Sequence, residues 1–493
     1  TISVIHSQVK EPEKVIRILA KELKMDEDQI RRKVEKVSSR EKIKSNVDKK
    51  TSDTIRDYGL AGVTVDEDDK RQYPYGSLGS KVLGFTGADN QGIIGLEVSY
   101  EKFLKGIDGA ILTTTTAGGV EIENGAEERV EPVSGQNLTT SLDVTIMQYA
   151  DQVANQILQK KKAKSVDIIV MNPNNGEIYA MACAPEFDLN SPFEITGDTT
   201  SMTAKEKQDL RNQMWRNPCV SDTYEPGSTF KVLTSAAGIE KKVVTMNDHF
   251  FCPGYRIVED RRIRCHKTTG HGSETFLQGI MNSCNPVFMD VGSRLGVHNF
   301  FEELNQFQLM KRTGIDLPGE AATIFHKEDK VGAVELATIS FGQSFQISPV
   351  RLLASCSAII NGGTSVTPHV GVSTAREDGS YMKKFTYPGG SRVVSKETSD
   401  QIREALGKVV SEGTGKNAGV EGYEVGAKTG TSQKLPRGNG KYIASTLAFA
   451  PVSKPEVITL VRIDEPEGTY YGGTVAAPVV SQLYTNLLPY ILK

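Results

Sequence analysis

The chain has 493 residues, of which 38% are hydrophobic and 24% are charged, an ordinary globular composition with room for about two to four domains. Its 58 basic and 61 acidic residues give a net charge of −3, so there is no electrostatic reason to expect a nucleic-acid or anionic-membrane partner. No run of about 18 apolar residues occurs and the first residue is Thr1, so the sequence predicts no membrane span or signal peptide within it.

The first part of the chain is predicted to be a separate, non-catalytic module. Residues 11–37 carry charged, amphipathic helical patterns that are typical of a solvated helix pair. Residues 66–109 are instead rich in glycine and turn residues, and the stretch up to residue 133 alternates like short strands. We therefore interpret residues 1–135 as one irregular, elongated pedestal or dimerisation-type module.

A compact domain is predicted over residues 136–493. Asp143 is the expected N-cap of a helix that ends near residues 160–162. Five strand-like runs are drawn from both ends of the domain: 166–171, 177–184, 425–432, 446–450 and 457–464. They predict a five-stranded antiparallel sheet closed by its first and last strands, with the helical patterns between residues 227 and 360 covering it. The expected fold class is therefore α+β.

A serine and a lysine spaced by one helical turn form a candidate nucleophile and base. Ser228 follows a Pro-Gly pair and precedes an apolar run, which predicts a helix start, and Lys231 lies on the same helix face. A serine needs a base, and a lysine in a desolvated, cation-rich pocket can be neutral near pH 7 and accept its proton. Alone the pattern is weak, because Ser-x-x-Lys also occurs at Ser7, Ser39, Ser99 and Ser380.

Two further elements follow in chain order. They are Ser283-Cys284-Asn285, and Lys428-Thr429-Gly430-Thr431 within a predicted strand. Taken singly, these could be polar helix-start residues, a strand-edge charge and a β-turn. Together with the Ser-x-x-Lys element and in this order, they resemble the signature of penicillin-binding proteins and active-site serine β-lactamases.

Further landmarks make most of residues 65–493 resemble class B penicillin-binding proteins, with the look of Gram-positive members of the stage V sporulation protein D type. These landmarks are Arg71 to Pro74, Gly92 to Glu97, Ser134 to Leu138, Gly413 to Gly415 and Gly472 to Pro478. The resemblance implies a penicillin-binding transpeptidase domain and a peptidoglycan DD-transpeptidase, a serine acyltransferase that needs no cofactor for the acyl transfer.

The resemblance also implies a role for each residue of the first two elements. Ser228 would attack the D-Ala-D-Ala carbonyl of a stem peptide, and Lys231 would take its proton. Ser283 would relay a proton to the leaving D-alanine, whereas Asn285 would hold Lys231 and the substrate amide.

The third element would bind the substrate. Lys428 would add positive potential to the pocket, and the hydroxyls of Thr429 and Thr431 would donate to the terminal carboxylate. The backbone N–H groups of Ser228 and Thr431 would stabilise the oxyanion. Gly430 would let the substrate lie along the strand edge, where a side chain would obstruct it.

Partners and location follow from the same resemblance. The expected ligands are peptidoglycan stem peptides and β-lactam antibiotics, in division or sporulation. Residues 1–135 carry no glycosyltransferase-like segment, so a glycosyltransferase partner in the membrane is expected. The location implied is the outer face of the cytoplasmic membrane, with anchoring by an N-terminal helix absent from this chain.

Two rival functions stay open at this stage. A β-lactamase or DD-carboxypeptidase would share the acylation chemistry but pass the acyl group to water. A penicillin-sensing receptor or scaffold would use the same domain for binding alone.

Cysteines and histidines gather beside the second element. Residues 249–284 hold three of the six cysteines and three of the seven histidines. A hairpin turning near residues 259–260 is expected to bring Cys252 and Cys265 together across its strands, with His266 and His271 following at once. These four side chains are the hypothesised zinc ligands.

The cluster leaves other readings open as well. The possible completing ligands are Asp248, His249 and Cys284. A disulfide between Cys252 and Cys265, or thiols simply packed in the core, would account for the same residues.

Overall fold

The computed structural model describes residues 1–67, 70–113 and 127–492, and it contains two compact units. The N-terminal unit comprises residues 1–74, 84–138 and 374–382. The larger unit comprises residues 75–83, 139–373 and 383–493. All three sequence elements that carry the candidate chemistry therefore belong to the larger unit.

The N-terminal unit begins with a small sheet covered by helices. The strands are β1 (Ile2–Val4), β2 (Glu41–Lys44) and β3 (Val63–Val65), in the order β2-β1-β3, and the helices are α1 (Pro12–Leu23), α2 (Glu27–Val34) and α3 (Lys49–Asp57). The apolar faces of α1 and α2 bury Ile16, Leu19 and Ile30 against β1. Asp26 begins α2, because its side chain accepts hydrogen bonds from the backbone of Asp28 and Gln29. The helix pair expected within residues 11–37 is confirmed.

The rest of this unit is irregular, as the glycine-rich sequence predicted. Its elements are α5 (Gly95–Ser99), α6 (Glu101–Leu104) and the antiparallel pair β4 (Ala110–Thr113) and β5 (Glu127–Val130). The expected strand alternation between residues 114 and 126 lies outside the described residues.

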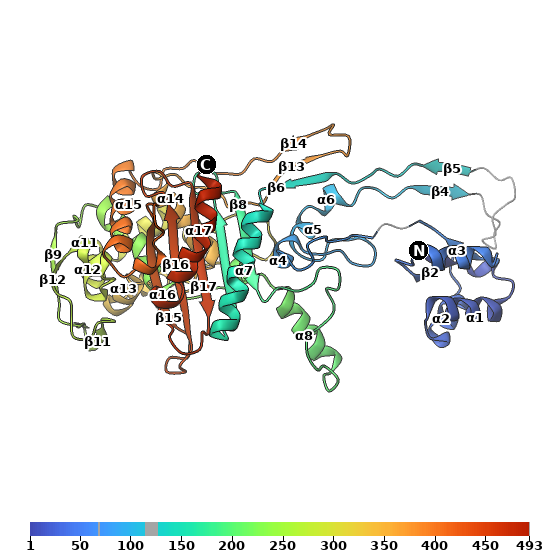
Figure 1. The fold of residues 1–493 in the computed structure, drawn as a ribbon, viewed down its shortest axis with the longest axis horizontal. Coiled ribbons are helices and arrows are strands. Elements are labelled where there is room, and N and C mark those ends of the chain that lie inside the picture. The colour runs from blue at the N-terminus through green and yellow to red at the C-terminus, as the bar shows by residue number, and fades with distance from the viewer. Residues whose placement is uncertain (68–69, 114–126, 493) are drawn as a thin grey trace. The chain divides into compact units, whose positions relative to one another are not determined.

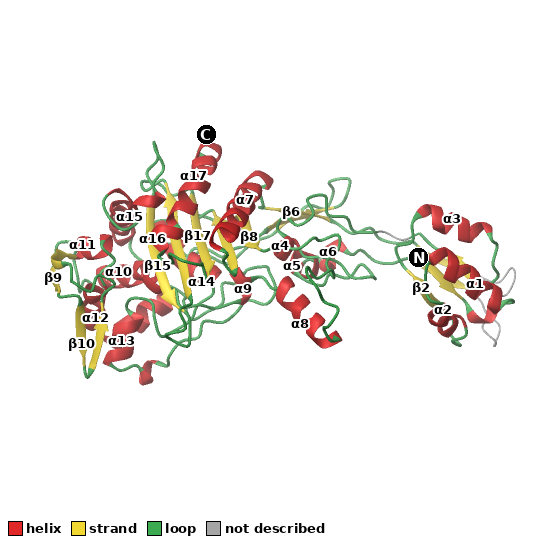
Figure 2. Ribbon diagram, turned by 60° about the horizontal axis from the view of Figure 1, so that its bottom comes forward, coloured by secondary structure: helices red, strands yellow, loops and turns green. Residues whose placement is uncertain are grey.

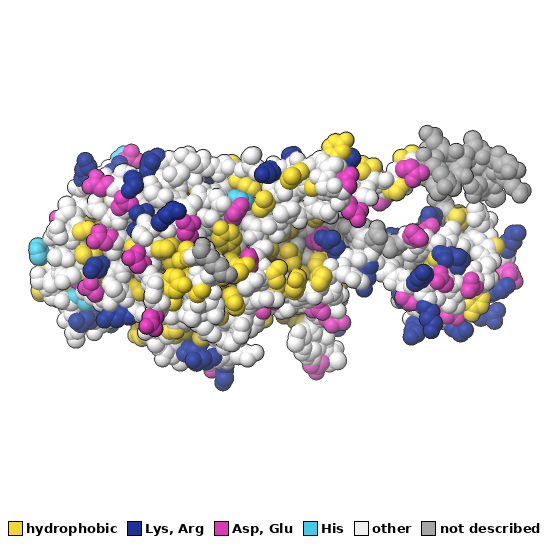
Figure 3. Space-filling view, turned by 45° about the horizontal axis from the view of Figure 1, so that its top comes forward, with side chains coloured by type: hydrophobic (Ala, Val, Ile, Leu, Met, Phe, Trp, Pro, Cys, Tyr) yellow, Lys and Arg dark blue, Asp and Glu magenta, His cyan; other side chains and the backbone are white. Residues whose placement is uncertain are grey.

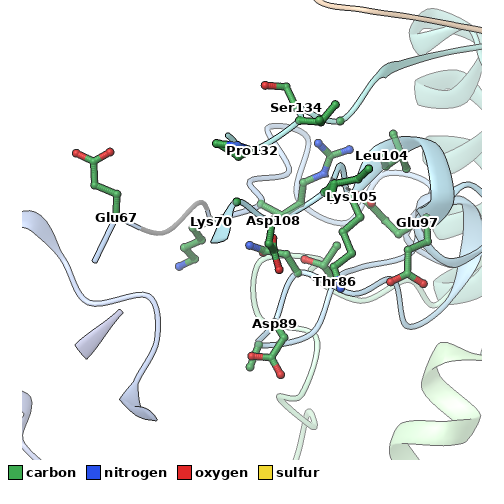
Figure 4. A pocket seen from close by; sticks show the side chains of 18 of the residues that line it. Glu67, Lys70, Thr86, Asp89, Glu97, Leu104, Lys105, Asp108, Pro132 and Ser134 are labelled. Atoms are coloured by element: carbon green, nitrogen blue, oxygen red, sulfur yellow. Dashed lines mark hydrogen bonds and ion pairs between the residues drawn. The ribbon is translucent and has the colours of Figure 1, made fainter. Parts of the chain in front are cut away.

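Two of the family landmarks meet in this unit. Arg71 Nε donates to Glu97 Oε1 over 2.7 Å, and Tyr73 Oη donates to the same oxygen over 3.2 Å. Glu97 and Arg71 line a polar pocket of about 870 Å³, together with Thr86, Asp89 and other residues of the unit (Figure 4). The landmark residues thus fix the local backbone through a buried carboxylate.

The larger unit is built on an antiparallel sheet of five strands. In spatial order they are β15 (Gly426–Gln433), β16 (Tyr442–Ala450), β17 (Val457–Asp464), β7 (Ser165–Met171) and β8 (Ile178–Ala184). The last strand, β17, pairs with the first, β7. The arrows of β15, β16 and β17 lie side by side in Figure 1. The predicted sheet and its closure are confirmed. Strand β16 begins four residues earlier than expected, because the residues from Ile443 to Ser445 are all buried and show no polar alternation.

Two helices cover one face of this sheet. They are α7 (Val144–Lys161) and α17 (Ala477–Ile491), and both lie in front of the strands in Figure 1. Asp143 caps α7 by accepting a hydrogen bond from the backbone of Ile146, as the sequence predicted. Alanine, valine and leucine side chains from both helices and from the sheet form a continuous core.

A second group of helices contains Lys231 and Asn285, each at the start of its helix. It comprises α10 (Lys231–Glu240), α11 (Phe276–Met281), α12 (Asn285–Gln306), α13 (Ala333–Ile339), α14 (Pro349–Ile360) and α15 (Lys396–Ser411), which Figure 2 shows in red beside the yellow strands. Other elements in the described residues include α4 (Ser80–Leu83), β6 (Asn137–Thr140), α8 (Ala204–Trp215), α9 (Pro218–Ser221), β13 (Gly371–Ala375), β14 (Lys383–Lys384) and α16 (Gly472–Val475). None of the helices in the described ranges has the length and apolar character needed to cross a bilayer.

Charged side chains of both signs are interspersed on the face drawn in Figure 3. This mixture agrees with the net charge of −3 and gives no extended surface of one sign on that face. Nothing in it favours a nucleic-acid partner.

Candidate active site

Ser228 lies on a tight turn that leads into a helix. The 3-10 turn Gly227–Phe230 runs directly into α10, so Ser228 precedes the first residue of that helix by one turn. Gly227 has a φ of 56°, and a Cβ at this position would lie 2.9 Å from the carbonyl oxygen of Thr431. Only glycine therefore lets the turn Gly227–Phe230, named here the serine turn, pack this closely against β15.

Lys231 is completely buried beneath this turn. Its Nζ donates to the carbonyl oxygen of Ser283 over 2.7 Å, to Ser283 Oγ at 3.2 Å and to Asn285 Oδ1 over 2.8 Å. The amine also lies 5.1 Å from the ring centre of Phe288. The first two sequence elements therefore meet through one amine.

Lys428 reaches the same place from β15. Its Nζ donates to Ser283 Oγ over 2.8 Å and to the carbonyl oxygen of Thr429 over 3.1 Å. Ser283 has a φ of 54°, a left-handed conformation that is uncommon for residues other than glycine. Such backbone strain gathers at functional sites, and here it accompanies a hydroxyl shared by two amines.

Burial changes the ionisation of both lysines. Loss of water lowers the pKa of Lys231 to about 8. Burial, together with the charge of Lys231, also lowers the pKa of Lys428 well below its usual range. The space behind the two amines is apolar, being lined by Val232, Ile280, Ile402, Ala405 and Leu406. A neutral amine is therefore available at this site near neutral pH.

The strand β15 lies at the edge of the sheet and is paired only with β16. Its free edge can pair with an extended peptide backbone. Thr429 is buried, whereas Thr431 is partly exposed and its Oγ1 accepts a hydrogen bond of 2.9 Å from the backbone of Gly472.

Gly430 has a packing role that the sequence did not indicate. A Cβ there would lie 2.8 Å from Ser445 Oγ and 3.0 Å from the carbonyl oxygen of Pro226. These contacts favour glycine for packing between β15, β16 and the serine turn. The expectation that the missing side chain also makes room for substrate stays a prediction.

Sequence reasoning missed Glu225, which supports the serine turn. Its buried carboxylate accepts a hydrogen bond of 2.9 Å from the backbone of Ser344 and pairs with Arg437 Nη2 at 2.5 Å. The only signal in the sequence is an acidic residue directly before the Pro-Gly pair.

A ribbon made of two separate antiparallel strand pairs carries the cysteine and histidine cluster. One pair is β9 (His249–Cys252) with β12 (Gly272–Thr275), and the other is β10 (Tyr255–Val258) with β11 (Arg261–Arg264). Strands β10 and β11 pair across a turn at residues 259–260, as predicted. Cys252, however, lies opposite Gly272, and Cys265 follows β11 with its N–H donating to the carbonyl of Gly254. The expectation that the two cysteines face each other across paired strands was therefore wrong.

The cysteines still come together at the base of the ribbon. Ligand atoms of Cys252, Cys265, His271 and Cys284 all lie within 4.8 Å of one another. His266 stays outside this group, because its side chain is exposed and its Nδ1 is 3.8 Å from the Cys265 sulfur. All six cysteines are buried free thiols.

Comparison with known proteins decides the family. The transpeptidase domain of penicillin-binding proteins matches residues 167–485, and the penicillin-binding protein dimerisation domain matches residues 1–140. This chain belongs to the class B penicillin-binding proteins. The family and the α+β fold expected from the sequence are thereby confirmed, and the penicillin-binding protein is an enzyme of the serine acyltransferase type.

The relatives of this penicillin-binding protein include a sporulation protein and a probable peptidoglycan D,D-transpeptidase. Stage V sporulation protein D of Bacillus subtilis is 38% identical, over 99% of this chain and 75% of its own length. The probable peptidoglycan D,D-transpeptidase PenA of Neisseria meningitidis is 29% identical, over 88% of this chain and 71% of its own. The crystal structure of penicillin-binding protein 3 of Mycobacterium tuberculosis is 27% identical, with a TM-score of 0.73 over 86% of this chain and 91% of its own.

Proposed function

We propose that this chain is a peptidoglycan D,D-transpeptidase that works through an acyl-enzyme on Ser228. The observation that carries the proposal is the Ser283 hydroxyl, held between the buried amines of Lys231 and Lys428 next to the serine turn. The nucleophile and the base thus come from one segment of the chain, the proton relay from a second and Lys428 from a third.

In the first half-reaction, the neutral amine of Lys231 takes the proton of Ser228 Oγ as that oxygen attacks the carbonyl between the two D-alanines. The backbone N–H groups of Ser228 and Thr431 stabilise the resulting oxyanion. When the C–N bond breaks, the leaving amine takes up a proton relayed through Ser283, which leaves an ester on Ser228 and free D-alanine.

In the second half-reaction, an amine of another stem peptide attacks this ester. A new amide bond forms, and Ser228 recovers its proton as the serine leaves. The donor peptide lies along the free edge of β15, and the hydroxyls of Thr429 and Thr431 donate to its terminal carboxylate.

Asn285 positions Lys231, because its Oδ1 accepts a hydrogen bond from the amine while its Nδ2 donates to the carbonyl of Arg264 over 3.2 Å. During the reaction, the same amide is proposed to bind the substrate backbone. Lys428 adds positive potential that favours the substrate carboxylate.

The reaction needs glycan strands and therefore a second enzyme. We propose a membrane glycosyltransferase as the partner and the outer face of the cytoplasmic membrane as the location. The division into a leading module of residues 1–135 and a transpeptidase domain of residues 136–493 stays a prediction.

Covalent labelling tests the proposal directly. A fluorescent penicillin should label the protein stably, and mapping of the labelled peptide should place the adduct on Ser228. The Ser228→Ala variant should lose labelling. Ser380→Ala, which removes the serine of another Ser-x-x-Lys sequence, should label like the parent protein. An adduct at any other residue would overturn the assignment, and rapid release of the hydrolysed drug would favour a hydrolase.

A further inference from the structure

The cluster at the base of the ribbon has the composition of a metal site. Three sulfur atoms and one imidazole come from Cys252, Cys265, Cys284 and His271. Thiolate and imidazole ligands in a tetrahedral set of four are typical of structural zinc. In such a site, Zn–S bonds of about 2.3 Å place the sulfurs about 3.8 Å apart. The ligand atoms here already lie within 4.8 Å of one another, so small side-chain rotations would complete the geometry.

The environment of the cluster also fits a metal. The three cysteines are each no more than 2% exposed, and this burial restricts the competition from water. Beside them, Glu274 is 3% exposed, and its Oε1 has no hydrogen-bond partner in the described part of the chain. That oxygen lies 3.8 Å from His271 Nδ1, whereas Oε2 accepts from Asn282 over 3.0 Å. The same Nδ1 atom lies 3.7 Å from the Cys265 sulfur, so this nitrogen faces the cluster. The buried carboxylate beside it adds negative charge that favours a bound cation.

A second group of possible ligands is equally buried but differs in composition and charge. Asp167, Cys183 and Cys219 also lie within reach of one another, but Asp167 Oδ2 accepts two hydrogen bonds from Arg462, at 2.9 and 2.6 Å. That carboxylate is already neutralised by a guanidinium, and the group contains no histidine. It serves below as the internal comparison.

The cluster is joined to the catalytic residues through the backbone. Cys284 is the N-cap residue of α12 and stands between Ser283 and Asn285. From the ribbon, the carbonyl of Arg264, next to Cys265, accepts the hydrogen bond of Asn285 Nδ2. The ends of the ribbon and the start of α12 therefore meet at the cluster.

We propose that Cys252, Cys265, His271 and Cys284 bind one zinc ion that fastens the β9 to β12 ribbon to the start of α12. The ion is structural, with four protein ligands, and it leaves the acyl transfer to the serine and lysine side chains. By fixing Cys284, it positions Ser283 and Asn285. Only this positioning effect depends on the proposed function; the metal site itself does not.

Metal content of the full chain tests the site without any assay of activity. Protein purified without added zinc should contain about one zinc per chain by elemental analysis. The variants Cys284→Ser and His271→Gln should lose it. The matched controls His266→Gln and Cys183→Ser should keep it, because these residues lie outside the proposed ligand set. Glu274→Gln should weaken zinc affinity by roughly 10- to 100-fold.

Two further measurements keep the test decisive if a variant fails to fold. Cobalt bound to the parent protein should show intense thiolate-to-metal absorption and the visible bands of a tetrahedral site. Removing zinc from the parent protein with a chelator should lower its melting temperature and slow penicillin acylation, and zinc should restore both.

Metal-free parent protein with three reactive thiols at the cluster, or with two of them oxidised to a disulfide, would overturn the proposal. Equal zinc content in His271→Gln and His266→Gln would overturn it too. Zinc binding without any acylation would instead contradict the proposed function alone.

Discussion

The amine of Lys428 donates a hydrogen bond of 2.8 Å to the hydroxyl of Ser283, 145 residues earlier in the chain. Lys231 donates to the same hydroxyl from the other direction, at 3.2 Å. One oxygen thus connects two amines whose pKa values burial lowers. This arrangement gives Ser283 a route for moving a proton and makes both lysines testable.

The pH dependence of acylation should report the ionisation of Lys231. The base is active only when it is neutral, and its pKa is about 8. Since the neutral fraction falls as pH drops, the acylation rate should decrease about tenfold per pH unit below pH 8 and level off above it. Stopped-flow measurement with a fluorescent penicillin between pH 6 and about 9.5 would show this. A rate that is constant or falls as the pH rises from about 6 to 8 would exclude Lys231 as the base.

Replacement of Lys428 should impair acylation more than folding. Lys428→Met keeps most of the side-chain volume in a buried position but removes the amine that donates to Ser283. We expect acylation to slow by roughly 10²- to 10³-fold, the usual cost of losing one positioned donor. Lys441→Met, which removes a half-exposed partner of Glu465, is the control and should acylate normally. Equal rates for the two variants would argue against a role for Lys428.

Alanine at position 430 should destabilise the protein through a clash in its interior. The new methyl group would meet Ser445 Oγ and the carbonyl of Pro226, so β15 and the serine turn must separate. The expected cost is about 1 to 3 kcal/mol, with slower acylation. Thermal unfolding and labelling rates measure the two effects. In the control, Gly407→Ala, the methyl would meet only Val452 side-chain atoms at 3.3 Å or more, so little change is expected. Full stability of Gly430→Ala would contradict the packing role and leave the substrate role alone.

A buried ion pair joins the first and last strands of the sheet. Asp167 in β7 and Arg462 in β17 are directly opposite in register, and both are almost inaccessible to solvent. Arg462→Met alone should lower the free energy of unfolding by about 3 to 5 kcal/mol. Because burial raises the pKa of Asp167, the stranded carboxyl can take up a proton, which favours the lower end of this range. The double variant Asp167→Leu with Arg462→Met should recover much of the loss in urea denaturation. If the double variant recovers no stability, the ion pair contributes more to the free energy of unfolding than the apolar packing that replaces it.

Local patterns predicted most of the fold. The strands of the sheet were found because their buried runs end at turn residues, and Asp143 was recognised because an N-cap acts on the helix that directly follows it. The hairpin turn at residues 259–260 was found for the same reason. Each of these signals involves residues that are close together in the sequence, so it can be recognised without knowledge of the tertiary structure.

Contacts between distant segments were harder to predict. His266 was expected at the metal site because it adjoins Cys265, but the path of the chain after β11 leaves it exposed and brings in Cys284 instead. The packing role of Gly430 could not be predicted, because its neighbours in the interior, Ser445 and Pro226, lie in other segments of the chain.

By itself, the sequence determined which reactive groups are present: a serine with a lysine one turn later, then Ser283 with Asn285, then Lys428, in the order of the signature that penicillin-binding proteins share with active-site serine β-lactamases. It could not determine that the hydroxyl of Ser283 accepts hydrogen bonds from both Lys231 and Lys428. Nor could it determine which four side chains come together at the base of the ribbon. Those outcomes depend on how β15, α10 and the start of α12 pack together, because packing alone sets the distances between atoms that the chain separates by many residues.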